Sequence, residues 1–152
     1  MISYSKNIEL EELMPLVRER IDAGQSVWFS PKGTSMLPMI RQGVDTVCIS
    51  PIKGPLKKYD IPFYQRENGQ YVLHRIVRVE DTYTCIGDNQ FDLETGLRHD
   101  QMIAVLTAFS RGKKRYSVTS LRYRLYCRLW HYSRPIRLLW RKAIGRLRRI
   151  IQ

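Results

Sequence analysis

Apolar positions change their spacing twice along the chain, and these changes predict two kinds of structure. Residues 7–23 repeat apolar side chains at helical intervals, and Gly24 follows the last of them. Between residues 27 and 110 the apolar runs are short, rich in β-branched and aromatic side chains, and separated by Gly, Pro and Asn. Helical spacing returns from residue 121. The pattern predicts a mainly β domain with an N-terminal helix, capped by Asn7, and a C-terminal helical tail.

The short apolar runs are the candidates for strands. One ends at Phe29, and the others cover residues 45–51, 61–66, 70–80, 83–86 and 102–110. Asn68-Gly69 predicts a tight hairpin that leads into the run 70–80. A turn at residues 80–82 predicts a second hairpin, and the polar stretch 91–100 predicts a loop.

Positive charge is concentrated at the C-terminal end. Residues 1–100 hold 12 Lys and Arg against 14 Asp and Glu, whereas residues 101–152 hold 14 Lys and Arg and no acidic residue. The net charge of +12 therefore arises in the last third of the chain. Length and pattern together predict a helix within residues 1–24, a β-rich domain over 25–118 and a basic helical tail over 119–152.

Two amphipathic helices are expected in this tail, with a break near Ser133-Arg134-Pro135, because proline disfavours helical backbone in the residue before it. Their apolar stripes are Leu121, Leu125, Leu129 and Tyr132, and then Ile136, Leu139, Trp140, Ala143, Leu147 and Ile150. Basic side chains beside Trp and Leu favour binding to an anionic membrane surface. The alternatives are packing of the stripes on the β domain and binding of nucleic acid, although so regular a stripe argues against a purely electrostatic nucleic-acid tail.

Targeting and redox signals are weak. Charged residues interrupt the apolar positions of 7–23, and no run approaches the ~20 apolar residues of a spanning helix, so neither a signal peptide nor a transmembrane segment is predicted. The expected location is the cytoplasmic side, with peripheral membrane association. Cys48, Cys85 and Cys127 are far apart and form no C-x-x-C motif. We therefore expect no disulfide framework, no metal site and no cofactor.

The stretch Gly33-Thr34-Ser35-Met36-Leu37-Pro38 is the first candidate for chemistry. A short apolar strand precedes it, glycine permits unusual backbone angles, and proline favours a turn. Such a bend exposes the hydroxyl of Ser35 beside free peptide N–H groups. An exposed nucleophile and donors for an oxyanion are two requirements of nucleophilic catalysis at a carbonyl.

The third requirement is a base, and His74 is the best candidate. It lies in the expected strand 70–80, and the hairpin that follows would bring Asp88 of the Gly87-Asp88-Asn89 turn back towards it. A serine, a histidine and an aspartate thus occur at strand ends and turns that can converge. Asp92 and Glu94 lie close to Asp88 in the sequence and are alternatives for the carboxylate.

Four of these features together resemble a known family. Gly33-x-Ser35-Met36-x-Pro38, Tyr59-Asp60-Ile61, His74-Arg75-Ile76-Val77 and Gly87-Asp88-Asn89 occur in the order found in type I signal peptidases. More broadly they resemble the serine peptidase clan that these share with LexA-type repressors. A histidine at the base position is similar to the eukaryotic, archaeal and sporulation-type branch, which uses Ser-His-Asp. The resemblance covers about residues 27–108.

The resemblance implies a role for each matching residue. Ser35 would be the nucleophile, His74 the general base and Asp88 the group that orients the imidazole. Gly33, Thr34, Met36 and Pro38 would contribute to substrate binding or to the oxyanion hole, together with the Ser35 N–H. The chain departs from the family at Gly33, where many members carry a hydroxyl, at Val44 and Tyr59, where glycine is usual, and in lacking the usual membrane anchor.

The expected function is that of a serine endopeptidase that cleaves a leader, signal or precursor peptide through an acyl-enzyme on Ser35. The expected partners are this peptide and an anionic membrane surface, with nucleic acid disfavoured. The alternative is a LexA-like regulatory or binding module, self-cleaving or non-catalytic, that uses its basic tail on nucleic acid or membrane. Only about 24 residues precede the β-rich part, too few for a helix-turn-helix domain.

Overall fold

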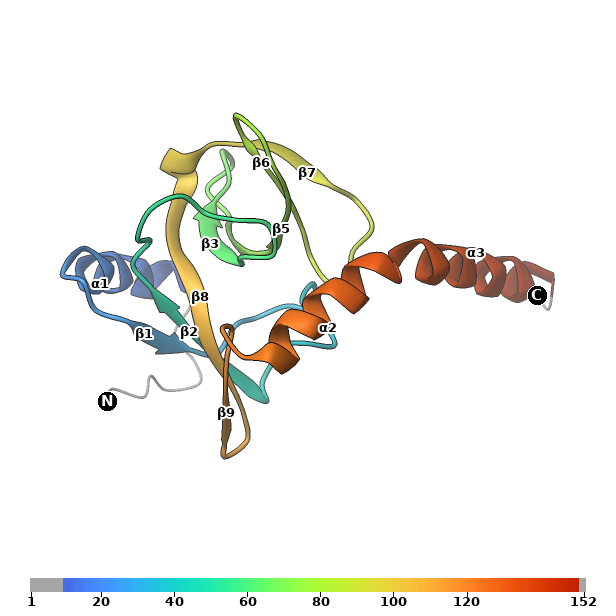
Figure 1. The fold of residues 1–152 in the computed structure, drawn as a ribbon, viewed down its shortest axis with the longest axis horizontal. Coiled ribbons are helices and arrows are strands. Elements are labelled where there is room, and N and C mark those ends of the chain that lie inside the picture. Colours follow the sequence, from blue (N-terminus) through green and yellow to red (C-terminus); the bar gives the residue numbers. More distant parts are fainter. Residues whose placement is uncertain (1–9, 151–152) are drawn as a thin grey trace.

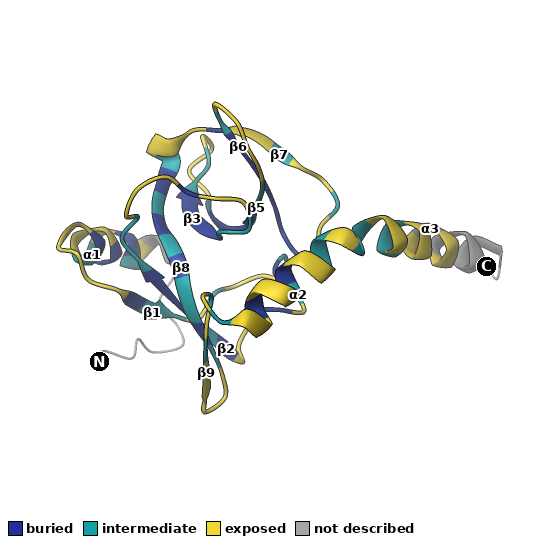
Figure 2. Cartoon of the chain, in the orientation of Figure 1, coloured by how far each residue is buried: buried dark blue, intermediate teal, exposed yellow. Residues whose placement is uncertain are grey.

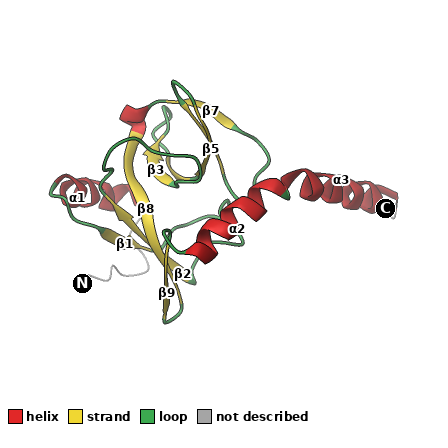
Figure 3. Cartoon of the chain, in the orientation of Figure 1, coloured by secondary structure: helices red, strands yellow, loops and turns green. Residues whose placement is uncertain are grey.

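The computed structural model describes residues 10–150, and its fold is mainly β with helices near both ends (Figures 1 and 3). The helices are α1 (Leu10–Asp22), α2 (Leu121–Tyr132) and α3 (Arg134–Ile150), with a short 3-10 turn at His99–Gln101. The strands are β1 (Val27–Phe29), β2 (Asp45–Ser50), β3 (Pro62–Gln65), β4 (Tyr71–Leu73), β5 (Arg75–Val79), β6 (Tyr83–Ile86), β7 (Glu94–Leu97), β8 (Met102–Arg111) and β9 (Lys114–Ser117). The mainly β prediction with an N-terminal helix and C-terminal helices is confirmed. The expected Asn7 cap lies outside the described residues.

The strands form two antiparallel sheets. The larger sheet has the order β1-β2-β8-β3-β4, and β9 pairs with the far end of β8. The smaller sheet has the order β5-β6-β7. The long strand β8 pairs with β2 and with β3, so it organises the larger sheet (Figure 1).

Two clusters of buried apolar side chains hold these layers together. The first joins α1, the larger sheet and α2, with Met14, Val47 and Cys127 among its members. The second lies between the two sheets and contains Tyr64 and Ile76. Both clusters draw on side chains far apart in sequence, so α1 and α2 are fixed to the β domain by apolar burial.

The predicted strand 70–80 is wrong in one respect, because the chain breaks at His74 into β4 and β5. β4 pairs with β3 in the larger sheet, whereas β5 pairs with β6 in the smaller one. His74 is the single residue at which the chain leaves one sheet for the other. Within this run Leu73 belongs to the first cluster, and Val72 and Ile76 belong to the second.

Two other expectations need correction and two are confirmed. The stretch 91–100, predicted as a loop, contains β7, whose only strand partner in the described chain is β6. Strand β9 was missed because its segment is basic and carries little apolar pattern. The Asn68-Gly69 hairpin between β3 and β4 and the break between the two tail helices are confirmed.

The two C-terminal helices differ in how they meet the domain (Figures 1 and 2). Helix α2 begins at the cap Ser120, whose hydroxyl accepts from the Tyr123 N–H, and it buries Tyr123 and Cys127 against the domain. Helix α3 projects away from the β domain. Among the described helices, none combines the length and the apolar character needed to cross a membrane.

Candidate active site

Apolar side chains that follow Ser35 anchor its turn in the core. Met36, Met39 and Ile40 are buried in the first core cluster, whereas Ser35 is half-buried. The Leu37 N–H donates to the Thr34 carbonyl at 3.2 Å, which closes the turn. Burial of the residues that follow Ser35 fixes the turn, whereas Gly33 and Thr34 before it are exposed, so Ser35 lies at the rim.

Two glycines shape this turn. Gly33 has φ of +93°, a conformation that side chains rarely adopt, and its N–H donates to Gln42 Oε1 at 2.9 Å. Gly87 approaches the turn from β6, and a Cβ placed there would lie 2.6 Å from the Ser35 carbonyl oxygen. The Asn89 N–H donates to that same oxygen at 2.8 Å. The Gly87-Asp88-Asn89 segment therefore supports the backbone of Ser35 directly.

Ser35 and His74 line one cavity of about 300 Å³. Its other lining residues are Pro31, Lys32, Gly33, Thr34, Met36, Ile40, Arg66, Gln70, Tyr71, Val72, Leu73 and Gln90. Several of these, including Gly33 and Gln70, are exposed, so the cavity reaches the surface. The structure thus brings together two residues that are far apart in the sequence, at a place that solvent reaches.

His74 is buried and lines the cavity. Its Nδ1 lies 3.3 Å from the Tyr64 hydroxyl and 3.5 Å from Glu94 Oε2. Its Nε2 has no hydrogen-bond partner among the described residues, and neither has Ser35 Oγ. Neither atom is among the buried side-chain atoms that lack a partner, which in the described chain are only the Nε atoms of Arg134 and Arg137. Both atoms therefore retain solvent contact.

The hydroxyl of Tyr64 connects His74 to Glu94. It donates to Glu94 Oε2 at 2.8 Å, so its oxygen is left as the acceptor for a hydrogen bond from His74 Nδ1. This arrangement places the imidazole proton on Nδ1 and leaves Nε2 as the basic atom. The tautomer is the one that a general base facing the cavity requires.

Glu94 is itself held by Arg66. The Arg66 Nε donates to Glu94 Oε1 and Nη2 to Oε2, both at 2.7 Å, which forms a bidentate pair. Burial raises the pKa of Glu94, but the hydrogen bonds from Arg66 and Tyr64 outweigh that effect and hold the pKa below its ordinary value. Glu94 is therefore a fixed anion at neutral pH.

Burial also governs the charge of His74. Removal from water lowers its pKa to about 4 from an ordinary 6.5, and the nearby Glu94 opposes this shift without cancelling it. The imidazole is consequently neutral at neutral pH, and Nε2 can accept a proton.

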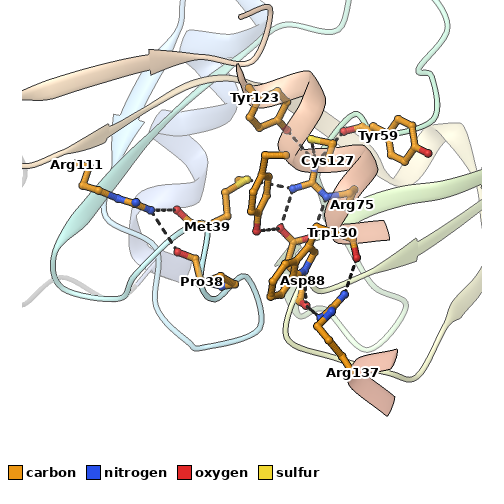
Figure 4. A network of polar contacts seen from close by, with 11 residues as sticks. Pro38, Met39, Tyr59, Arg75, Asp88, Arg111, Tyr123, Cys127, Trp130 and Arg137 are labelled. Carbon is orange, nitrogen blue, oxygen red and sulfur yellow. Dashed lines mark hydrogen bonds and ion pairs between the residues drawn. The ribbon is translucent and has the colours of Figure 1, made fainter. Parts of the chain in front are cut away.

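Asp88 does not occupy the predicted position beside His74. Its carboxylate forms a bidentate ion pair with Arg75, with both N–O distances 2.8 Å (Figure 4). In the register of the β5-β6 hairpin Arg75 is opposite Ile86, which precedes Asp88 by only two residues. The carboxylate that reaches His74 is that of Glu94, which the sequence left open as an alternative. Asp92 is exposed.

The residues predicted around Ser35 divide into two groups. Gly33, Thr34 and Met36 line the cavity with it. Pro38 does not, because the turn carries it to the other side, where it is exposed and its carbonyl accepts from Arg111 Nη2 at 3.3 Å (Figure 4). Pro38 therefore belongs to the support of the turn and not to the cavity wall.

Neither Tyr64 nor Arg66 was predicted as a site residue, although the sequence contains a signal for Tyr64. In the Asn68-Gly69 hairpin Tyr64 is opposite Val72. His74 follows Val72 by two residues and lies on the same face, within reach of a tyrosine. Counting the register from the turn would have found this neighbour. Arg66 carries no such signal, because its contact with Glu94 depends on how the two sheets meet.

Other reactive groups offer no second site. The three cysteines are free and buried. Within residues 10–150 no three His, Cys, Asp or Glu side chains are grouped so that they could hold a metal ion.

Comparison with known proteins does not extend this description. No protein-family model matches the chain, and neither a curated protein nor a solved structure matches it. The site is therefore interpreted from its own geometry and from the motif resemblance.

Proposed function

We propose that this protein is a serine peptidase in which Ser35 is the nucleophile and His74 the general base. The observation that carries the proposal is the shared cavity, which a supported, half-buried serine and a buried, neutral histidine both line. Tyr64 and Glu94 replace the predicted Asp88 as the groups that orient the imidazole. The motif resemblance to type I signal peptidases points to the same chemistry.

The reaction follows from the positions of the protons. Nε2 of His74 accepts the proton of Ser35 Oγ as this oxygen attacks the carbonyl carbon of the scissile bond. The imidazolium keeps its Nδ1 proton towards Tyr64, while the anionic Glu94 stabilises its charge. His74 then gives the Nε2 proton to the leaving amine, and a water activated by the same nitrogen hydrolyses the acyl-enzyme.

In the described structure no hydrogen bond joins Ser35 Oγ to His74. Catalytic hydrogen bonds often shorten only when substrate is bound, and binding here would exclude water from a cavity that is already narrow. We propose that the Ser35 N–H, for which no acceptor is found among the described residues, donates to the oxyanion.

The cavity also indicates how a peptide would bind. Strand β4 contributes Tyr71, Val72 and Leu73 to its wall, and its only strand neighbour in the described chain is β3. An extended peptide can add to such an edge through main-chain hydrogen bonds. Met36 and Ile40 supply apolar surface for a side chain next to the scissile bond. The substrate that we propose is a leader or precursor peptide in extended conformation.

The test is active-site labelling and cleavage. The wild-type protein is treated with a fluorophosphonate probe and, separately, incubated with a peptide library read by mass spectrometry. We expect covalent labelling at Ser35 and cleavage, both reduced at least about 10³-fold in Ser35→Ala and in His74→Ala. Ser30→Ala is the matched control, because Ser30 is exposed and outside the cavity, where its hydroxyl donates to the Asp45 carbonyl.

Absence of both labelling and cleavage in the wild-type protein between pH 5 and pH 9 would contradict the peptidase proposal. It would favour the binding module. Labelling that persists in Ser35→Ala would move the nucleophile elsewhere.

A further inference from the structure

A continuous apolar stripe runs along the outer side of the two C-terminal helices. Its members are Leu121, Leu125, Leu129, Tyr132, Ile136, Leu139 and Trp140, each between 55% and 80% exposed. Their spacing of three or four residues continues across the break at Ser133, so one stripe spans both α2 and α3. Large apolar side chains in an unbroken row are uncommon on the surface of a soluble domain and indicate contact with something else.

The stripe is not the side by which α2 packs on the domain. Tyr123 and Cys127 bury the opposite side of that helix, and Trp130 Nε1 donates to the Asp88 carbonyl at 2.8 Å. Because the inner side of α2 is already occupied, the stripe is an additional surface. This observation removes the sequence-based alternative in which the α2 stripe packs on the β domain.

The junction of the two helices is held firmly. The guanidinium of Arg137 lies over the Trp130 ring at 3.7 Å and donates to the Trp130 carbonyl at 2.7 Å and to the Asp88 carbonyl at 3.2 Å. Arg134 donates to the Phe91 carbonyl. Both arginines thus clamp the segment 88–91, so the stripe has a fixed orientation relative to the β domain.

Positive charge surrounds the stripe. Residues 101–152 contain no acidic side chain, and Arg122, Arg124, Arg128 and Arg141 are exposed on α2 and α3. A cavity of about 610 Å³ beside the junction is lined by further basic side chains, which are Lys57, Lys58, Arg78 and Arg134. This surface suits a partner that offers apolar area and negative charge together.

We propose that α2 and α3 dock the protein on an anionic membrane surface, with the stripe in the acyl–headgroup boundary and the arginines on the lipid phosphates. A second copy of the chain fits less well, since pairing two such stripes would bring their basic flanks together without a compensating acid. Nucleic acid would match the charge but would leave the leucines and isoleucines in water. The proposal does not depend on the peptidase activity.

The fixed junction has a consequence for the candidate active site. The clamped segment 88–91 includes Asn89, which holds the Ser35 carbonyl, and Gln90, which lines the cavity. A membrane bound by the stripe would therefore lie at a constant distance and angle from Ser35. Peptides presented at the bilayer surface would meet the cavity in one orientation.

The test is co-sedimentation of the full chain with vesicles of phosphatidylcholine alone or mixed with phosphatidylglycerol. We expect binding to the mixed vesicles that is at least about tenfold tighter than binding to the neutral ones and that weakens in high salt. The double variant Leu139→Asp/Trp140→Asp should lose at least about tenfold in binding, because it places two charges in the stripe. The pair Arg122→Gln/Arg124→Gln should lose binding to mixed vesicles only.

Val44→Asp is the matched control, since Val44 is an exposed apolar residue that belongs neither to the stripe nor to the lining of the cavity beside the junction. It should bind vesicles as the wild-type protein does, and circular dichroism should show all variants folded. Absence of wild-type binding to mixed vesicles would overturn the proposal, and so would full binding by the Leu139→Asp/Trp140→Asp variant. If light scattering shows that the wild-type protein is a dimer and that this variant is a monomer, the stripe would be assigned to a second copy. Tighter binding to an oligonucleotide than to vesicles, unchanged in this variant, would assign the surface to nucleic acid.

Discussion

His74 and Arg75 are consecutive residues, yet their surroundings differ completely. The side chains of Arg75 and of its partner Asp88 are only 2% and 1% exposed. The Arg75 guanidinium also contacts the Tyr123 hydroxyl and the sulfur of Cys127 (Figure 4). His74 faces the cavity of Ser35, and its partner Glu94 is 22% exposed. Both residues are buried and each has a carboxylate partner, but Asp88 is sealed whereas Glu94 is partly exposed, so the pair with Arg75 is the sealed one and the pair with His74 the open one.

The comparison separates stability from chemistry. Burial lowers the pKa of Arg75, but Asp88 more than offsets this, so the pKa is raised well above its ordinary value and the guanidinium stays charged. A sealed guanidinium that keeps its charge can move no proton. His74 is neutral, and its Nε2 has no hydrogen-bond partner among the described residues, so this atom can accept a proton. Of these two consecutive residues, His74 thus lines the candidate active site, and Arg75 stabilises the fold around it.

The largest expected effect is on the sealed pair. Asp88→Ala leaves the buried Arg75 charge without a counter-ion, and we expect it to reduce the free energy of unfolding by about 3–5 kcal/mol. Urea unfolding followed by circular dichroism measures this loss. Asp92→Ala is the matched control, because Asp92 is a nearby but exposed carboxylate, and it should change stability by less than about 0.5 kcal/mol.

A second variant tests whether the lost stability comes from the unpaired charge of Arg75. Arg75→Met/Asp88→Leu removes both charges and should recover much of the lost stability, since replacing a buried pair by apolar groups is often neutral. If Asp88→Ala unfolds as the wild-type protein does, the pair does not stabilise the fold in the way proposed here.

The open pair should show the reverse behaviour. Glu94→Gln keeps the size of the side chain but removes the negative charge that stabilises an imidazolium. We expect kcat/KM, or the rate of fluorophosphonate labelling, to fall about 10²-fold while the free energy of unfolding changes by about 1 kcal/mol or less. Full activity in Glu94→Gln, together with an inactive but folded Asp88→Asn, would return the orienting role to Asp88.

The smallest effect is a shift in pH dependence. With a His74 pKa of about 4, the general base remains unprotonated well below the ordinary value of 6.5. The acid limb of the kcat/KM profile should therefore fall near pH 4 to 5. An acid limb centred at 6.5 would show that His74 is not the buried base described here.

The same pKa has a consequence for stability. Between pH 6.5 and about 4 the unfolded chain binds a proton at His74 that the folded chain does not, so the free energy of unfolding falls as the pH is lowered through this window. The contribution is on the order of 3 kcal/mol when complete. In His74→Ala this part of the pH dependence should disappear, which unfolding at several pH values measures.

The elements with a strong local pattern could be predicted from the sequence. The helical spacing of 10–22 and 121–150, the β-rich run of 45–50 and the Asn68-Gly69 hairpin all match the structure, because periodicity and turn chemistry act over a few residues. β7 and β9 could not be predicted in this way. Their burial patterns show few buried positions, so little hydrophobic signal marks them in the sequence.

By itself the sequence determined the turn at Ser35, the β-rich segment around His74 and the amphipathic character of the tail, since each depends on residue type and short spacing. The tertiary structure alone decided which carboxylate serves the histidine. Asp88, Asp92 and Glu94 are close along the chain, but Asp88 pairs with Arg75, whereas the pairing of β7 with β6 places Glu94 near the imidazole. Pairings between sheets depend on register and on the angle at which the sheets meet, and neither quantity is encoded in a local stretch of residues.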